Sequence, residues 1–250
     1  MTKPLYGKTL VLAHRGASAY YPENTMPAFE AAVDMKSDGF ELDVHLSADG
    51  EVVITHDTTL DRVTNKTSTG PVAQKTYAEL LACDVSAQFH ETMKSVRMPR
   101  LDDVYRLIAD TDLIVNVEIK AEGRPLLEKL LALEDEYGMR DRIIYSSFNH
   151  FNLTELQKMR SDITVAPLYF FNMVAPWLYT AIIGAQAVHP HYKQLFLLPE
   201  YVTECHRRKI AVNTWTVDDP DTAKQLADMG VDAIITNKPD LIRDTLGYRA

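Results

Sequence analysis

The sequence predicts a (β/α)8 barrel, and three observations lead to this fold class. Short apolar runs of strand length alternate with longer segments of helical period, which is typical of a parallel sheet with crossover helices. Eight such units fit into 250 residues, the usual size of a closed barrel. No GxGxxG motif follows the first predicted strand, so the doubly wound open sheet is the less favoured alternative.

The predicted strands are apolar runs bounded by turn residues. In chain order they cover residues 9–13, 40–44, 52–55, 113–119, 142–147, 163–169, 185–190, 209–217 and 232–236. Segments of helical period lie between most of these strands, and three of them are predicted helices. The first, 25–36, has Thr25 as its N-cap and Pro27 in its first turn. The other two cover 124–137 and 219–230.

The alternation of strands and helices breaks after the second strand. An extra strand, 52–55, joins the preceding one through an Asp-Gly pair, which is typical of a tight hairpin. Residues 58–98 are then polar and rich in turn residues, with one short helix predicted at 76–84. We therefore expect a single domain over residues 1–250, with a small insertion at about 58–98.

Residues 168–185 form the most apolar segment of the chain and begin at the end of a predicted strand. A buried helix is the first expectation for such a segment. Three alternatives stay open. The segment could line a channel for an apolar leaving group, touch a membrane surface, or form the contact of a homodimer.

Composition and charge limit the classes of function. The formal net charge of -9 provides no basic stripe for a phosphate backbone, which argues against a nucleic-acid partner. A small anionic substrate stays compatible with a few focused cations. The distant cysteines Cys83 and Cys205 predict reduced thiols in a cytoplasmic protein. No apolar run is long enough for a signal peptide or for the roughly 18 residues of a membrane span, so no integral membrane segment is expected.

Acidic residues occur inside two predicted strands, where a core would favour apolar side chains. Successive side chains of a strand point to opposite faces, so Glu41 and Asp43 share one face while their apolar neighbours share the other. In a barrel the apolar face packs on the helices, and the acids point inward. The same alternation turns Glu118 inward, and Lys120 continues that face. All four residues lie near the carboxyl ends of their strands, where barrel enzymes place their sites.

The three inward acids Glu41, Asp43 and Glu118 predict a metal site. Buried carboxylates are costly unless they are paired or bind a cation. One alternative is that each forms a salt bridge, with Arg15 or Lys120 as the partner. Two single positive charges, however, neutralise three close carboxylates less well than a divalent ion does. Ligands that are all oxygen atoms favour Mg²⁺ or Ca²⁺ over zinc.

Two histidines extend this set of residues. His14 ends the first predicted strand, and His56 follows the extra strand. Cleavage of a P–O bond needs one group that activates the nucleophile and one that protonates the leaving oxygen, and imidazole titrates near neutral pH. Either histidine alone would be read as structural. With the metal and the cations of Arg15 and Lys120, they predict phosphoryl transfer.

Several motifs match those of one enzyme family in order and spacing. They are AHRGASAYYPENTMPAFEAA (13–32), FELDVHLSADGEVVITHDTTLDRVTN (40–65), VNVEIK (115–120), SSF (146–148), VNTWTV (212–217) and ITNKPD (235–240). Over essentially the whole chain, the sequence resembles the glycerophosphodiester phosphodiesterases of the bacterial cytosolic type. This resemblance implies a (β/α)8 barrel with an inserted segment. It also implies hydrolysis of glycerophosphodiesters to sn-glycerol 3-phosphate and an alcohol.

The resemblance further implies a role for each of the candidate residues. These are His14 and His56 as the acid–base pair, Arg15 and Lys120 as the phosphate clamp, and Glu41, Asp43 and Glu118 as ligands of one divalent cation, Mg²⁺ or Ca²⁺. Trp215, an aromatic residue that points inward near the rim, is expected to be either a wall for the glycerol carbons or a plain core residue. In related barrels the glycerol 2-hydroxyl is thought to attack first, and water then opens the cyclic phosphodiester.

Three other functions remain as alternatives. A lysophospholipase D would share every catalytic residue, and the apolar 168–185 segment is its one support. A metal-dependent sugar isomerase would not need two histidines together with an Arg-Lys clamp. A non-catalytic protein that binds a phosphate ligand would be expected to lack a histidine or an acid, and all of them are present.

Overall fold

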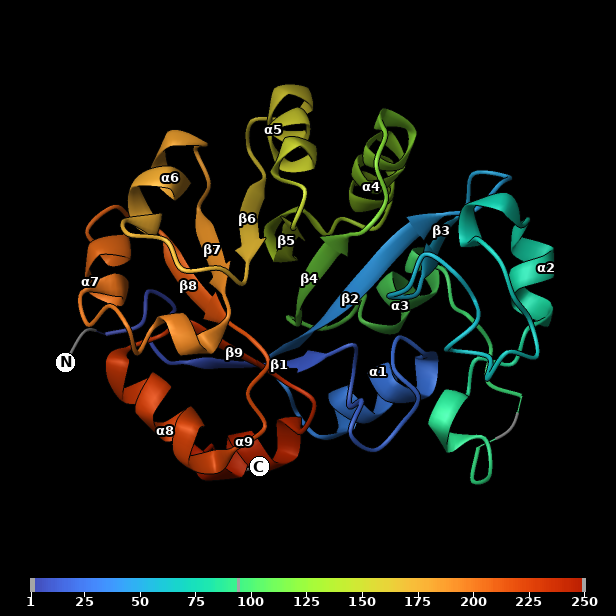
Figure 1. The fold of residues 1–250 in the computed structure, drawn as a ribbon, viewed down its shortest axis with the longest axis horizontal. Helices are drawn as coiled ribbons and strands as arrows, with labels where there is room; N and C mark the ends of the chain where they lie inside the picture. The colour runs from blue at the N-terminus through green and yellow to red at the C-terminus, as the bar shows by residue number, and fades with distance from the viewer. Residues whose placement is uncertain (1–2, 94, 249–250) are drawn as a thin grey trace.

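The computed structural model describes residues 3–93 and 95–248, and its centre is a closed barrel of parallel strands (Figure 1). Within the described residues these strands are β1 (Leu10–His14), β2 (Gly39–Leu46), β4 (Ile114–Ile119), β5 (Ile143–Ser147), β6 (Thr164–Tyr169), β7 (Ala187–Pro190), β8 (Ala211–Thr214) and β9 (Ala233–Thr236). The barrel closes because β1 pairs with both β9 and β2. The predicted (β/α)8 fold class is confirmed, and each strand overlaps a predicted one.

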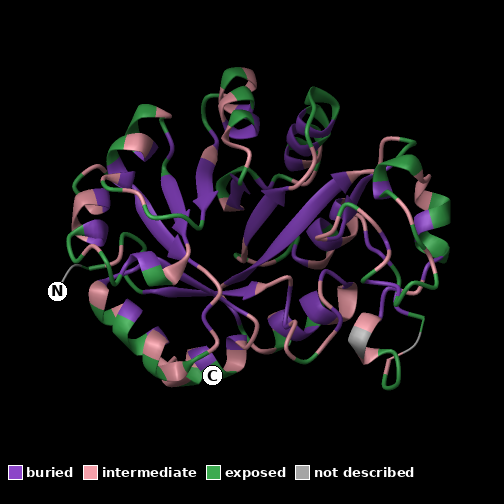
Figure 2. Cartoon of the chain, in the orientation of Figure 1, coloured by how far each residue is buried: buried purple, intermediate pink, exposed green. Residues whose placement is uncertain are grey.

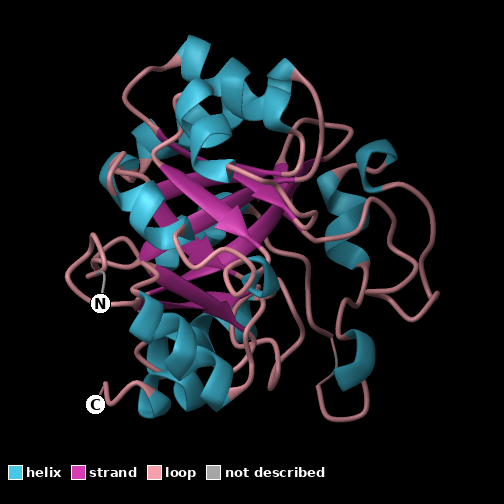
Figure 3. Cartoon of the chain, turned by 60° about the vertical axis from the view of Figure 1, so that its left-hand side comes forward, coloured by secondary structure: helices cyan, strands magenta, loops and turns pink. Residues whose placement is uncertain are grey.

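Helices surround the strands on the outside of the barrel (Figures 1 and 3). They are α1 (Met26–Asp34), α3 (Leu101–Leu107), α4 (Arg124–Glu136), α5 (His150–Met159), α6 (Pro176–Ile182), α7 (Tyr201–His206), α8 (Pro220–Met229) and α9 (Pro239–Thr245), with the short 3-10 turns η3 (Arg140–Arg142) and η4 (Tyr192–Gln194). Capping residues fix both ends of helix α8. Asp219 accepts a hydrogen bond from the Thr222 N–H at its start, and Gly230 ends it with a φ of 87°.

The largest apolar core lies between the strands and the helices, as the buried inner faces of the helices in Figure 2 show. Leu42 and Val44 of β2 belong to this core, whereas Glu41 and Asp43 alternate with them along the strand. Their alternation puts the apolar side chains against the helices and leaves the polar ones facing the barrel interior. The strand pattern read from the sequence therefore positions the acids.

Residues 58–98, called the 58–98 segment below, lie between β3 (Val52–Ile54) and α3, at one side of the barrel (Figure 1). Strand β3 pairs antiparallel with β2 and forms the predicted hairpin. The segment contains η1 (Val72–Gln74), α2 (Tyr77–Ala82) and η2 (Ala87–Phe89). A reciprocal capping box of Thr76 and Glu79 starts α2. The segment packs on β3 through a small apolar cluster that includes Val53, Leu60, Val72 and Leu80.

The apolar 168–185 region is not a buried helix, so that expectation was wrong. The first two residues end β6, a loop follows, and α6 covers only Pro176–Ile182. This short helix can bury few side chains, and Val174 and Ile182 are 90% and 83% exposed. The region therefore exposes several apolar side chains, including Phe170 and Phe171, while Trp177 packs into a core cluster. Among the described residues, no helix is both long enough and apolar enough to cross a membrane.

Candidate active site

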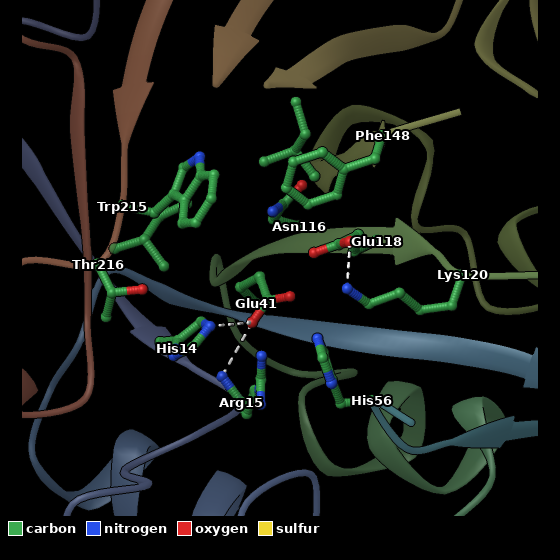
Figure 4. A pocket seen from close by; sticks show the side chains of 12 residues that line it. His14, Arg15, Glu41, His56, Asn116, Glu118, Lys120, Phe148, Trp215 and Thr216 are labelled. Atoms are coloured by element: carbon green, nitrogen blue, oxygen red, sulfur yellow. Dashed lines mark hydrogen bonds and ion pairs between the residues drawn. The ribbon is translucent and has the colours of Figure 1, made fainter. Parts of the chain in front are cut away.

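A cavity with about 450 Å³ of open space lies at the carboxyl ends of the barrel strands. Of the eight candidate residues, seven line it: His14, Arg15, Glu41, His56, Glu118, Lys120 and Trp215. The eighth, Asp43, is fully buried beside Glu41 and Glu118. In Figure 4 the carboxylates lie in the middle, the histidines and Arg15 on one side, and Trp215 and Phe148 on the other. The structure thus brings together all the residues that the sequence singled out.

Strand register explains why the acids meet. Asp43 of β2 is the direct neighbour of Glu118 on β4, and Glu41 is the neighbour of His14 on β1. One oxygen from each of Glu41, Asp43 and Glu118 lies within 4.8 Å of the others. Three carboxylates from two adjacent parallel strands therefore converge at one point.

The charge of this cluster is only partly compensated by protein groups. Arg15 Nε lies 3.2 Å from Asp43 Oδ2, Lys120 Nζ lies 3.2 Å from Asp43 Oδ1, and Lys120 also pairs with Glu118. Burial raises the pKa of Asp43, but Lys120 and Arg15 outweigh it and bring that pKa below its ordinary value. The pKa of Glu118 is raised to about 7, mainly by burial and then by the charge of Asp43. The pKa of Glu41 is raised well above its ordinary value by burial, Asp43 and Glu118. The salt bridges to Arg15 and Lys120 thus stabilise mainly the ionised form of Asp43.

The acidic cluster fits a hard divalent cation. Glu41 Oε1 is buried, and no donor from the described residues reaches it. Its other oxygen, Oε2, accepts the backbone N–H of Arg15 at 3.0 Å. A buried carboxylate oxygen without a partner is costly, and a cation would remove that cost. Because the three converging groups are all carboxylates, the donor set suits Mg²⁺ or Ca²⁺.

His14 is held by a neutral amide. Its Nδ1 lies 2.7 Å from Asn237 Oδ1, and Asn237 Nδ2 in turn donates to Asp218 at 2.6 Å. Because the amide oxygen can only accept, Nδ1 carries the proton and Nε2 carries the lone pair of the neutral ring. Nε2 lies 3.9 Å from Glu41 Oε2 at the cavity. Burial and the nearby Arg15 lower the pKa of His14 to about 4, so its ring is neutral near pH 7.

His56 is held by a carboxylate instead. Its Nδ1 lies 2.8 Å from Asp57 Oδ1, and its backbone carbonyl lies 3.3 Å from His45 Nε2. The Thr55 N–H bonds to the Asp43 carbonyl, which extends the hairpin and brings His56 to the cavity. Hydrogen bonds from Arg62 lower the pKa of Asp57 to about 2 despite partial burial, so this partner is ionised at neutral pH. His56 therefore has a charged acceptor at Nδ1, whereas His14 has a neutral one.

Arg15 takes a backbone conformation that few residues other than glycine adopt. Its φ is 56°, which turns the chain sharply after β1. The turn is fixed by the bond from the Arg15 N–H to Glu41 and by the Asn24 N–H, which donates to the Arg15 carbonyl. Gly16 follows with a φ of 80°, where a Cβ would lie 2.6 Å from the Ala28 backbone. Local strain of this kind is typical of functional sites.

Aromatic side chains form the opposite wall of the cavity. Trp215 Nε1 donates to the His189 carbonyl at 2.8 Å, which fixes the indole. The Phe148 ring meets Trp215 edge to face with 5.6 Å between centroids, and Lys120 Nζ lies 5.7 Å from the centre of the same ring. Trp215 is intermediate in burial and lines the cavity.

Sequence reasoning assigned no role to several residues that shape the site. One of them is Asn24, whose side chain donates to Asp43 at 2.8 Å. Thr25 does occupy the N-cap position, although its hydroxyl bonds to Pro22 rather than to the helix. Phe148 and Asn237 each follow a barrel strand directly. The rule that barrel sites gather at the carboxyl ends of strands could have identified those two.

Comparison with known proteins agrees with this geometry. The model of the glycerophosphoryl diester phosphodiesterase family matches residues 14–241. The chain belongs to this family. A glycerophosphodiester phosphodiesterase of Caldanaerobacter subterraneus is 39% identical over 239 residues, covering 94% of this chain and 96% of that protein. One from Bacillus altitudinis is 34% identical over 236 residues, covering 93% and 96%. As a member of the glycerophosphoryl diester phosphodiesterase family, the chain is a hydrolase of glycerophosphodiesters.

Solved structures of the same family share the fold. A glycerophosphodiester phosphodiesterase from Agrobacterium tumefaciens is 28% identical, with a TM-score of 0.83 and coverage of 94% of this chain and 99% of that one. A phosphodiesterase from Oleispira antarctica is 25% identical, with a TM-score of 0.84 and coverage of 96% and 97%. The Oleispira enzyme was solved in complex with its product, sn-glycerol-3-phosphate.

Proposed function

We propose that the protein hydrolyses glycerophosphodiesters to sn-glycerol 3-phosphate and an alcohol, with one divalent cation and with His14 and His56 as the acid–base pair. The observation that carries this proposal is the arrangement of the two histidines. Both line the cavity that contains the acidic cluster, and each is oriented through Nδ1 by a partner of different charge. The product bound in the Oleispira enzyme supports the identity of the phosphate product.

Protein groups would hold the substrate phosphate from two sides. Arg15 and Lys120 line the cavity next to the acids, and their cationic groups suit the non-bridging phosphate oxygens. Glu41, Asp43 and Glu118 would hold the cation. When bound, the cation supplies Lewis-acid stabilisation of the negative charge on the phosphate. Trp215 and Phe148 would exclude water from the glycerol carbons.

The different partners suggest different tasks for the histidines. In the first step His14 Nε2 takes the proton of the glycerol 2-hydroxyl, that oxygen bonds to phosphorus, and the alcohol leaves with a proton from His56. In the second step His56 takes a proton from water, the water oxygen bonds to phosphorus, and the ring oxygen leaves with the proton from His14. A neutral His14 suits the first acceptor, and His56, which is oriented through Nδ1 by the carboxylate of Asp57, is assigned as the first donor.

The test is phosphorus NMR of glycerophosphocholine turnover by the wild type and by His14→Ala. We expect sn-glycerol 3-phosphate as the product and loss of turnover in the variant. Titration calorimetry should show that the variant still binds Mg²⁺ or Ca²⁺, because the three carboxylates are unchanged. Wild-type turnover by His14→Ala would contradict the role of this histidine. A substrate without the 2-hydroxyl should be inert, and its rapid hydrolysis would contradict the cyclic route.

One observation favours a second candidate substrate, a lysophospholipid, which would make the enzyme a lysophospholipase D. Phe148 lines both the catalytic cavity and a neighbouring apolar groove between α5 and α6. Its ring lies 6.1 Å from that of Phe170, which is 70% exposed. An acyl chain on the glycerol could therefore leave the cavity along an apolar path.

Exposed residues on two sides of the molecule give a matched test of this second substrate. We expect Phe170→Ser to lower kcat/KM for lysophosphatidylcholine and to leave that for glycerophosphocholine unchanged. Leu81→Ser, which alters an exposed apolar residue of α2, is the control and should change neither value. No hydrolysis of lysophosphatidylcholine by the wild type would reject this second substrate.

A further inference from the structure

Arg62 links the 58–98 segment to the catalytic site. Its Nε and Nη2 atoms donate to the two carboxylate oxygens of Asp57 at 2.7 and 3.0 Å. Its Nη1 and Nη2 atoms donate to the two carboxylate oxygens of Glu23 at 3.1 and 2.7 Å. One guanidinium group therefore bridges two carboxylates, and it holds each of them by two hydrogen bonds.

Both carboxylates in turn contact residues that line the catalytic cavity. Asp57 Oδ1 lies 2.8 Å from His56 Nδ1, and Glu23 Oε1 accepts a hydrogen bond from Arg15 Nη1 at 3.0 Å. Glu23 contacts Arg15 and Arg62, and no hydrogen bond within the described residues joins it to His14. The side chains thus form one continuous series from His56 through Arg62 to Arg15.

We infer that Arg62 is a positioning residue that fixes His56, through Asp57, relative to Arg15, which is held through Glu23. This inference rests on the proposed roles of His56 and Arg15. A proton donor and a phosphate-binding group must keep a set distance and angle, and a small displacement of one lowers the rate strongly. Neither Asp57 nor Glu23 is fixed by a barrel strand, because Asp57 follows β3 and Glu23 lies in the loop before α1.

The chemistry of the contact requires arginine. Only a planar guanidinium has enough N–H groups in a fixed plane to bind two carboxylates with two bonds each, whereas a lysine ammonium acts as a point charge. The Arg62 side chain is 47% exposed, so its ion pairs contribute little to the stability of the fold. A contact that adds little stability but orders two catalytic groups indicates a role in geometry.

The inference also gives the 58–98 segment a function. Arg62 lies near its start, and the segment is held on β3 by its own apolar cluster. A correctly folded segment is therefore needed to present the guanidinium to the site. The catalytic geometry would then depend on a part of the chain outside the barrel strands.

The main test compares Arg62→Ala with Arg97→Ala, since both arginines belong to the 58–98 segment. Arg97 Nη1 donates to the carbonyls of Ala82 and Cys83 at 2.9 and 3.2 Å, so it supports the segment without touching the site. We expect kcat for glycerophosphocholine to fall about 10- to 100-fold in Arg62→Ala, as for other groups that orient catalytic ligands. Arg97→Ala should keep the wild-type kcat, and both variants should keep the wild-type Tm. Equal losses in the two variants, or none in Arg62→Ala, would overturn the inference.

Chemical rescue separates positioning from a structural role. Because the Arg62 side chain is half exposed, free guanidinium can reach the gap left in Arg62→Ala. We expect millimolar guanidinium, but not urea of the same shape, to restore part of kcat. Arg62→Lys should have a kcat below that of the wild type, because an ammonium group cannot hold both carboxylates by two bonds each. Equal effects of guanidinium and urea on kcat would contradict the role assigned to the charged guanidinium group of Arg62.

A double-mutant cycle tests the path through Asp57. Asp57→Asn keeps the shape of the side chain but removes its charge. If Arg62 acts through Asp57, Arg62→Ala should lower kcat far less in the Asp57→Asn background than in the wild type. If the loss of kcat in the double variant equalled the product of the two single losses, Arg62 would not act through Asp57. If His56→Ala kept its activity, the proposed function would fail. If His56→Ala were inactive but Arg62→Ala kept the wild-type kcat, only the role of Arg62 would be rejected.

Discussion

The two sides of the pocket mouth are built from opposite kinds of side chain. On the side of the 58–98 segment, charged groups are joined by bonds of 2.7 to 3.1 Å in the series His56, Asp57, Arg62, Glu23 and Arg15. On the other side, Trp215, Phe148 and Phe170 follow one another at 5.6 and 6.1 Å between ring centroids. Figure 4 shows His56 and Arg15 facing Phe148 and Trp215 across the carboxylates.

This difference separates reaction rate from substrate choice. Hydrogen bonds between charged groups depend on direction and fix the angles of the catalytic side chains. Apolar contacts have no such direction and tolerate ligands of different shape. We therefore expect changes on the charged side to lower kcat, and changes on the aromatic side to act mainly on KM and on the preferred substrate.

The largest effect on kcat is expected from replacing His56 on the charged side of the pocket mouth, compared with His150 on the aromatic side. His56→Gln should lower kcat about 10²- to 10⁴-fold, the range for loss of a general acid or base. His150→Gln is the control, because His150 lies by the apolar groove and contacts Tyr179 and the Leu168 carbonyl. It should keep the wild-type kcat in the same assay. Similar losses in both variants would remove the distinction between the two sides.

A buried histidine beneath the aromatic side should make the fold sensitive to acid. Burial lowers the pKa of His189 to about 3, so the unfolded chain, with an ordinary value near 6.5, binds the proton first as the pH falls. Stability is therefore lost below about pH 6.5 and continues to fall toward pH 3. From pH 7 to pH 5 this one group should cost about 2 kcal/mol of unfolding free energy.

Urea denaturation at several pH values measures this cost. His189→Gln keeps an acceptor for the Asn213 amide, which lies 3.0 Å from His189 Nε2, but has no proton to bind. The variant should lose less unfolding free energy than the wild type between pH 7 and pH 5. Identical losses in the two proteins would show that His189 is not the acid-sensitive group.

A smaller effect is expected from the aromatic wall. Phe148→Ala removes the ring between Trp215 and Lys120, so KM for glycerophosphocholine should rise about 3- to 10-fold, in line with the loss of one aromatic contact. The kcat should stay close to the wild-type value, since no hydrogen bond to either histidine is lost. A large fall in kcat with unchanged KM would place Phe148 in the chemistry rather than in binding.

The charged strands could be predicted because period and position agree. Glu41, Asp43 and Glu118 interrupt apolar strands at regular alternation, and a barrel turns one face of every strand inward. Their meeting also followed from the rule that the carboxyl ends of barrel strands share one face. The alternation within each strand, together with this rule, was therefore enough to predict where the acids lie.

Contacts made by loops could not be predicted in this way. Arg62 reaches Glu23 across 39 positions of sequence, and neither residue lies in a strand whose register could be counted. The 168–185 region was misjudged for a related reason. Its apolar character predicted burial, but the length and position of α6 decide which side chains find a surface to cover, and Ile182 finds none.

The most direct test of the central claim is the activity of the chelated protein toward glycerophosphocholine, followed by separate addition of Mg²⁺ and Ca²⁺. The claim is that the three carboxylates hold a divalent cation on which hydrolysis depends. Turnover should disappear after chelation and return with at least one of the ions, with sn-glycerol 3-phosphate as the product. Full turnover in a strong chelator would contradict the account.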